Sequence, residues 1–314
     1  MKRLLILLFC SFFLNEINAQ TILSITNSPL DTIDCNQNCH WVHADYIKPK
    51  LTTSYAVSTI PFNPISITGT TIALADDKFS AAVPIGFDFC FYGNVYSDVY
   101  ISTNGHLSFN SNYASASCTF DTKTPMPFYN STYPDNSIFC PFTDGYTLAG
   151  GTIKYTTVGT QPFRKFIVSF SSIPYFGVCS ATPSTFQCIL NETTNTIECH
   201  IANKSTCNAD TSNYLNYATL GIQSIGANNF LTAPGKNASI WNVNNQAWQF
   251  LPNGAIGYTL KWYENNLLLS TNTDSISVCG LFPKKIIAKL TLSCPNKIYQ
   301  DSIQLMGSRY MARK

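Results

Sequence analysis

The stretch from 83 to 110, VPIGFDFCFYGNVYSDVYISTNGHLSFN, constrains the fold more than any other part of the chain. Large apolar residues occupy alternate positions near its start, at Ile85, Phe87, Phe89 and Phe91. This period of two, in β-branched and aromatic residues, predicts a strand with one face buried in an aromatic core.

Two turn signals follow that strand. Tyr92-Gly93-Asn94 interrupts the alternation, and Asn104-Gly105 supplies the residue pair that most readily adopts the positive φ of a tight hairpin turn. Apolar residues resume between the two turns and again after the second one. The stretch therefore predicts two consecutive hairpins and an antiparallel, all-β fold.

The composition agrees with an exported β protein. Only 11% of the residues are charged and 45% are hydrophobic, and Asn, Thr, Ser, Tyr and Phe are abundant. These residues favour exposed sheet over helix. A formal net charge of +2 provides no basic patch that would indicate a nucleic-acid partner.

The first residues have the pattern of an export signal. A basic start, Met1-Lys2-Arg3, precedes an apolar run over 4–14, and Ile17-Asn18-Ala19 resembles a cleavage site. The run is too short for a stable membrane anchor, and no later segment is apolar enough to be a transmembrane segment. We expect residues 1–19 to be a signal peptide and the protein to be secreted, extracellular or at the cell surface.

Several ordered phrases carry a family resemblance. FYGNVYSDVYISTNGHLSFN, preceded by LADDKFS and followed by IFCPFTDGYTLAGGTIKY, resembles a nidogen-like module of large secreted surface proteins of the Bacteroidetes. TSYAVSTIPFNP, GTQPFRKFIVSF, GIQSIGANNF and APGKNASIWNVNNQAWQF extend the resemblance over most of the chain. It implies a large antiparallel β-sandwich and an extracellular adhesion or matrix-type role, with no ligand specified.

A turn at Pro252-Asn253-Gly254 predicts a domain boundary. After it, residues 257–304 contain five short strand candidates and resemble the small immunoglobulin-like or PKD-like modules that follow nidogen-like domains. We expect a nidogen-like domain over 20–252, a small immunoglobulin-like β unit over 257–304 and a basic tail over 305–314.

Twelve cysteines in an exported chain predict a fold braced by disulfides. Cys188 and Cys199 flank an ETTN turn, and a two-residue loop at Thr193-Thr194 would place them directly opposite each other. Cys179 and Cys207 bracket the same hairpin from outside. We expect the pairs Cys188 with Cys199 and Cys179 with Cys207.

Cys35, Cys39, His40 and His43 form a C-x3-C-H-x2-H pattern. Thiolate and imidazole groups are zinc ligands, but this spacing matches no known zinc module, and export favours oxidised cysteines. We therefore expect a short loop closed by a disulfide between Cys35 and Cys39.

The other cysteines lie at strand ends or within the family motifs. Cys279 and Cys294 end the runs SISVC and LTLSC, which predicts that they pair near the end of the chain. The nidogen-like resemblance implies cysteines at Cys90 and Cys118, hence a disulfide between these two and a free Cys140.

Asp76, Asp77 and Asp144 are the candidate ligands of a metal. Calcium needs several such oxygen donors around one point. The chain lacks a D-x-[DN]-x-[DN]-G loop, and aspartate is also common in β-turns, where its side chain bonds the backbone. We expect no cofactor and no metal, with calcium at these aspartates as the alternative.

Trp241 and Trp248, in WNVNNQAWQF, are the candidate ligand contacts. Aromatic side chains in an Asn-rich frame are typical of glycan binders, in which they stack on sugar rings. Their spacing also fits a final strand packed into the core, which we favour.

The chain carries no enzyme signature. There is no G-x-S-x-G elbow, HExxH, phosphate-binding glycine loop or glycosidase pair, and only four histidines are available as general bases. We predict a non-enzymatic adhesion module that binds an extracellular protein or matrix partner. A glycan-binding module and a structural stalk domain are the alternatives.

Overall fold

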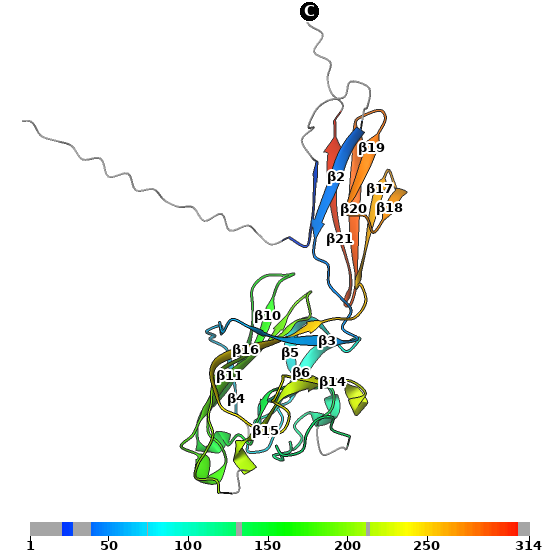
Figure 1. Ribbon diagram of the computed structural model, residues 1–314. Coiled ribbons are helices and arrows are strands. Elements are labelled where there is room, and N and C mark those ends of the chain that lie inside the picture. Colours follow the sequence, from blue (N-terminus) through cyan, green and yellow to red (C-terminus); the bar gives the residue numbers. More distant parts are fainter. Residues whose placement is uncertain (1–20, 28–38, 74, 130–133, 212–213, 307–314) are drawn as a thin grey trace, which may run out of the picture.

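The computed structural model describes residues 21–27, 39–73, 75–129, 134–211 and 214–306. Figure 1 shows two β units joined end to end. The all-β prediction is confirmed, because the helical elements are five short 3-10 turns: η1 (Ser111–Tyr113), η2 (Thr147–Ala149), η3 (Gly177–Cys179), η4 (Tyr214–Asn216) and η5 (Ile225–Ala227). No helix in the described part of the chain is long and apolar enough to cross a membrane. The expected signal peptide, Cys35 and most of the basic tail lie outside the described residues.

The larger unit is a sandwich of two antiparallel sheets. The first sheet has the order β3 (Tyr55–Ile60), β16 (Val243–Pro252), β12 (Ile197–Lys204), β11 (Ser184–Asn191), β10 (Lys165–Ile173), β9 (Thr152–Val158) and β4 (Thr70–Ile72). The second has the order β14 (Phe230–Thr232), β13 (Tyr217–Gln223), β8 (Ser137–Phe142), β7 (His106–Ser108), β6 (Asn94–Ile101) and β5 (Val83–Phe91), with β15 (Ser239–Ile240) paired to β13.

The alternation in β5 forms the centre of the sandwich core. Phe89 and Phe91 are completely buried and share one cluster with Phe250 of the opposite sheet. The Asn104-Gly105 turn joins β6 to β7, as the sequence predicts. Gly105 has φ +79°, and a Cβ there would collide with the carbonyl oxygen of Pro141. This turn therefore needs glycine for both its conformation and its close approach to β8.

The smaller unit packs a three-stranded sheet against a four-stranded one. The first has the order β1 (Leu23–Asn27), β2 (Cys39–Tyr46) and β19 (Ser275–Cys279), and the second has the order β18 (Leu267–Thr271), β17 (Tyr258–Glu264), β20 (Lys284–Ser293) and β21 (Asn296–Leu305). In Figure 1 the blue β2 lies among the orange and red strands of this unit.

The expected domain boundary at residue 20 is wrong, because β1 and β2 belong to the smaller unit. Ile25 and Val42 are buried in the same cluster as Trp262, and β2 pairs with β19. Without these two strands the inner face of the β17–β20 sheet would be exposed to water. The larger unit is thus an insertion between the second and third strands, in chain order, of the smaller one.

The structure contains three disulfides among the described cysteines, and one of them, Cys179 with Cys207, is an expected pair. The expected Cys35–Cys39 and Cys279–Cys294 pairs are replaced by Cys39–Cys279 and Cys90–Cys294. Cys39 and Cys279 lie opposite each other on the paired strands β2 and β19. Cys279 does not reach Cys294, because the two lie beyond opposite ends of the ten-residue strand β20, and Cys294 bonds Cys90 of the larger unit.

The expected Cys90–Cys118 and Cys188–Cys199 pairs are also wrong. Cys118 is free and packs with Phe79 in a separate cluster, whereas Cys90 sits near the end of β5 that faces the smaller unit. Cys188 and Cys199 do lie opposite each other, as the turn predicts, but both are free. Cys140 is free, as the resemblance implies.

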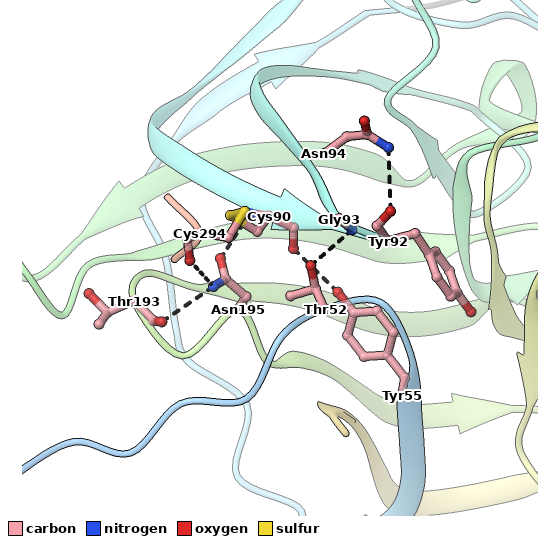
Figure 2. Close-up of a disulfide and its surroundings, with 9 residues drawn as sticks. All are labelled: Thr52, Tyr55, Cys90, Tyr92, Gly93, Asn94, Thr193, Asn195 and Cys294. Atoms are coloured by element: carbon pink, nitrogen blue, oxygen red, sulfur yellow. Dashed lines mark hydrogen bonds between the residues drawn. A yellow bond between two sulfur atoms is a disulfide. The ribbon is translucent and has the colours of Figure 1, made fainter. Parts of the chain in front are cut away.

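The Cys90–Cys294 disulfide connects the two units, and Asn195 braces it (Figure 2). The Asn195 side chain accepts a hydrogen bond from the Cys90 backbone N–H at 2.8 Å and donates one to the Cys294 carbonyl at 3.2 Å. It also donates to the Thr193 carbonyl at 3.3 Å, so one buried amide ties its own turn to both units. The joint is thus covalent and hydrogen-bonded.

Candidate functional site

A pocket of about 450 Å³ opens at one end of the large sandwich. It is lined by segments far apart in the sequence: the turn before Phe79, the loop after β8, η3, and the segment leading into η4. The lining residues are Asp77, Phe120, Asp144, Phe176, Gly177, Val178, Asp210, Tyr214 and Leu215. Two of the three candidate calcium ligands, Asp77 and Asp144, therefore meet in one cavity.

Asn104, from the predicted hairpin turn, positions both aspartates. Its side chain donates to the Asp77 carboxylate at 2.8 Å and accepts from the Gly145 backbone N–H at 3.1 Å. Asn104 is completely buried, so these bonds form away from water. A Cβ at Gly145 would lie 2.8 Å from the Thr103 carbonyl oxygen, so glycine lets the Asp144 loop approach this turn. The turn thus sets the floor of the pocket.

Two further contacts hold the walls together. The Cys179–Cys207 disulfide joins the end of η3 to the segment that carries Asp210. On the other side, the Tyr214 hydroxyl donates to the Phe120 carbonyl at 3.3 Å. The pocket is therefore built from long-range contacts and not from one flexible loop.

Asp144 is the residue with the most unusual electrostatics in the pocket. It is only 5% exposed. Burial, and then the neighbouring charges of Asp77 and Asp76, raise its pKa to about 7. The pKa of Asp76 is raised as well, by burial and by Asp77. Asp76 does not itself line the cavity, but its charge adds to the negative potential there.

Apolar side chains form the rim above these carboxylates. Phe120, Phe176 and Val178 are 53%, 48% and 70% exposed. Exposed apolar groups around a concave acidic floor are typical of a binding site and not of a folding core. The sequence gives no motif for this rim, because its residues come from loops with no shared periodicity.

The structure buries the predicted ligand contacts. Trp241 and Trp248 are 9% and 8% exposed and belong to the main core. The Trp241 ring N–H donates to the Ala218 carbonyl at 3.2 Å, and the ammonium groups of Lys204 and Lys236 lie over its ring. The packing role that we favoured from the sequence therefore fits, and neither tryptophan offers an open face for a sugar.

Of the four candidate zinc ligands near the start of the chain, Cys39 is in a disulfide with Cys279, and Cys35 lies outside the described residues. Instead, the sulfur atoms of Cys140, Cys188 and Cys199 lie within 4.8 Å of one another. Thiols are donors that soft metals prefer. All three residues are completely buried between the two sheets, and burial raises the pKa of the Cys140 and Cys199 thiols.

Comparison with known proteins gives one match. A family model described as NIDO related matches residues 54–260, which include every residue that lines the pocket. The matched range begins just before β3 and ends within β17, so it covers the whole inserted sandwich and the start of the first strand that follows it. No curated protein and no solved structure matches the chain.

Proposed function

The chain belongs to the NIDO-related family, and from this premise we propose that it is an extracellular binding module that adheres to a protein or matrix partner. We propose further that it is secreted or held at the cell surface, with residues 1–19 as its signal peptide. The three disulfides support an oxidising compartment.

The acidic pocket with its apolar rim is the observation that carries this proposal. It combines a buried carboxylate, Asp144, with the exposed apolar side chains of Phe120, Phe176 and Val178. Binding is favourable when a partner covers the apolar rim and pairs with the carboxylate, because both contacts lower the free energy of the complex. The module works by contact and performs no chemistry.

A binding screen of residues 20–314 against extracellular proteins and a glycan array tests the proposal. Phe176→Ser removes an exposed aromatic from the rim, and Phe230→Ser removes one of similar exposure that does not line the pocket. We expect a saturable protein partner whose affinity falls about tenfold or more in Phe176→Ser, or about 1.4 kcal/mol, and is unchanged in Phe230→Ser.

The other outcomes separate the alternatives. Glycan binding that depends on Phe176, with no protein partner, would make the protein a lectin-like module, since aromatic rims beside carboxylates also suit sugars. An equal loss of affinity in Phe176→Ser and Phe230→Ser would show that the partner does not bind specifically at the pocket. If the protein binds neither an extracellular protein nor a glycan, the remaining alternative is a structural stalk domain.

A further inference from the structure

The floor of the pocket carries negative charge that the described residues do not neutralise. No ion pair among them involves Asp76, Asp77 or Asp144. The nearby cations have other partners: the ammonium group of Lys78 bonds Ser117, and that of Lys123 lies over the ring of Tyr214. Among the described residues, these carboxylates therefore have no basic residue paired with them.

The Asp144 carboxylate is the strongest sign that an external cation completes the site. It is buried, it lines the cavity, and within the described residues no group donates a hydrogen bond to it. An isolated buried carboxylate is costly, and proteins normally pair one. Asp77, in contrast, is held by Asn104, and Asp210 accepts the Leu215 backbone N–H at 2.7 Å.

The shape of the pocket argues for an organic cation and against a bare metal ion. A cavity of about 450 Å³ is far larger than a calcium ion. Within the described residues, the aspartates do not bring three ligand atoms within 4.8 Å of one another, and only the buried cysteine cluster does. Calcium requires six to eight close oxygens. The walls of Phe120, Phe176 and Tyr214 suit a planar or methylene-bearing group instead.

We propose that this pocket binds the side chain of an arginine or lysine presented by the protein partner. The inference rests on the proposed function and names the group that the partner supplies. The cationic head pairs with Asp144 and Asp77, and the apolar stem lies along the rim. Aromatic walls add cation–π attraction in a partly desolvated site.

The pocket should bind its cation more tightly as the pH rises. The charges that act on Asp144 are those of Asp77 and Asp76. Asp210 and Tyr214 line the same pocket, and the ammonium group of Lys123 lies over the Tyr214 ring. Asp144 is protonated below its pKa of about 7 and then offers no charge. Binding of a cation favours the ionised form and releases the proton, so affinity increases from about pH 6 to about pH 8.

The test uses single-residue probes on the full chain. Nα-acetyl-arginine amide and Nα-acetyl-lysine amide are titrated by calorimetry or NMR, with the neutral isostere Nα-acetyl-citrulline amide and calcium chloride alongside. We expect saturable binding of a cationic probe, about tenfold or more weaker for citrulline and for Asp144→Asn. Asp45→Asn, which removes an exposed carboxylate from the smaller unit, should bind as the wild type does.

Thermal unfolding of Asp144→Asn shows whether that variant is folded before its binding is compared, and Asp77→Asn serves as a second variant. Equal binding of arginine and citrulline probes overturns the inference, as does wild-type affinity in both variants. Saturable calcium binding that Asp144→Asn abolishes overturns it in favour of a metal site. If a protein partner binds in a way that depends on Phe176 but on neither carboxylate, only the inference of a bound cation fails. If the arginine probe binds but the screen finds no protein partner, only the proposed function fails.

Discussion

Asp144 links the pocket to the stability of the fold, because its pKa rises from an ordinary 3.8 to about 7. An acid with a raised pKa binds its proton more tightly when folded. Between pH 3.8 and about pH 7 the unfolded chain loses this proton while the folded protein keeps it, so the free energy of unfolding falls as the pH rises through this range. We expect Asp144→Asn to raise the free energy of unfolding at pH 8 by about 2–4 kcal/mol and to have little effect near pH 4.

Denaturant unfolding at several pH values measures this difference. Asp45→Asn, at an exposed site of the smaller unit, serves as the control and should unfold as the wild type does at every pH. A gain in Asp144→Asn that is the same at pH 4 and pH 8 would contradict the raised pKa, since only ionisation produces the pH dependence.

The four free cysteines in the described part of the chain should be protected by the fold. Cys118, Cys140, Cys188 and Cys199 are all buried. We expect iodoacetamide to leave these thiols unmodified in the native protein and to modify all four after denaturation without reductant. Peptide mapping by mass spectrometry reads each site, and a linked Cys188–Cys199 peptide from the non-reduced protein would contradict their assignment as free.

Single residues are where the sequence predicted least about the site. Asp77 and Asp144 were candidates as generic oxygen donors, but nothing local shows that a distant turn brings them into one pocket. Phe120, Phe176 and Tyr214 carry no motif, since an exposed aromatic in a loop resembles any other loop residue. Trp241 and Trp248 were candidates because they are aromatic, yet both are buried in the main core, Trp248 on β16 and Trp241 just before that strand.

At the scale of elements, the turn after β11 holds a well-defined ion pair. Arg164 donates from two nitrogens to Glu192, at 2.8 and 2.6 Å, and a third nitrogen bonds the Gly86 carbonyl. Burial raises the pKa of Glu192, but hydrogen bonds from Arg164 outweigh this, so its pKa is lowered overall from 4.5. The pair therefore stabilises the fold above pH 4.5 and is lost as the pH falls through the lowered pKa.

Glu192→Gln should destabilise the protein by about 1–3 kcal/mol at neutral pH, because it leaves the Arg164 fork without its anion. Lys48→Met, which breaks the exposed pair with Asp274, should lower the free energy of unfolding by much less, because solvent screens that pair. Both values come from urea unfolding followed by circular dichroism. A Glu192→Gln variant that is no weaker than Lys48→Met would show that the turn does not depend on this pair.

The strands and turns were easier to predict from the sequence than the disulfide pairs. The alternation over 85–91 and the Asn104-Gly105 turn appear as expected, because both are local signals. Cys188 and Cys199 lie in the predicted register, but register alone does not form a bond. The pairs Cys39–Cys279 and Cys90–Cys294 span 240 and 204 residues, so they depend on how the units assemble, which no local pattern encodes.

On the scale of the whole molecule, the smaller unit depends on strands from both parts of the chain. A fragment of residues 47–314 lacks β1 and β2 and leaves Trp262 and Leu290 without their packing partners. We expect this fragment to bind the dye ANS strongly and to lose the folding of residues 258–305, whereas residues 20–314 stay compact. Limited proteolysis with mass spectrometry locates the cleavages, and resistance of 258–305 in the fragment would contradict the shared core.

The insertion also decides how the molecule responds to mechanical force. β1 and β21 lie side by side in the smaller unit, and the Ile25 backbone N–H donates to the Asp301 carboxylate at 2.8 Å. Tension applied through the chain on either side of residues 21–306 would enter at β1 and leave at β21. This force would be carried by the smaller unit alone. The large sandwich, with the Asp144 pocket, would not be stretched by it. The packing between β1 and β21, and not the large sandwich, would therefore resist a load applied between these two ends.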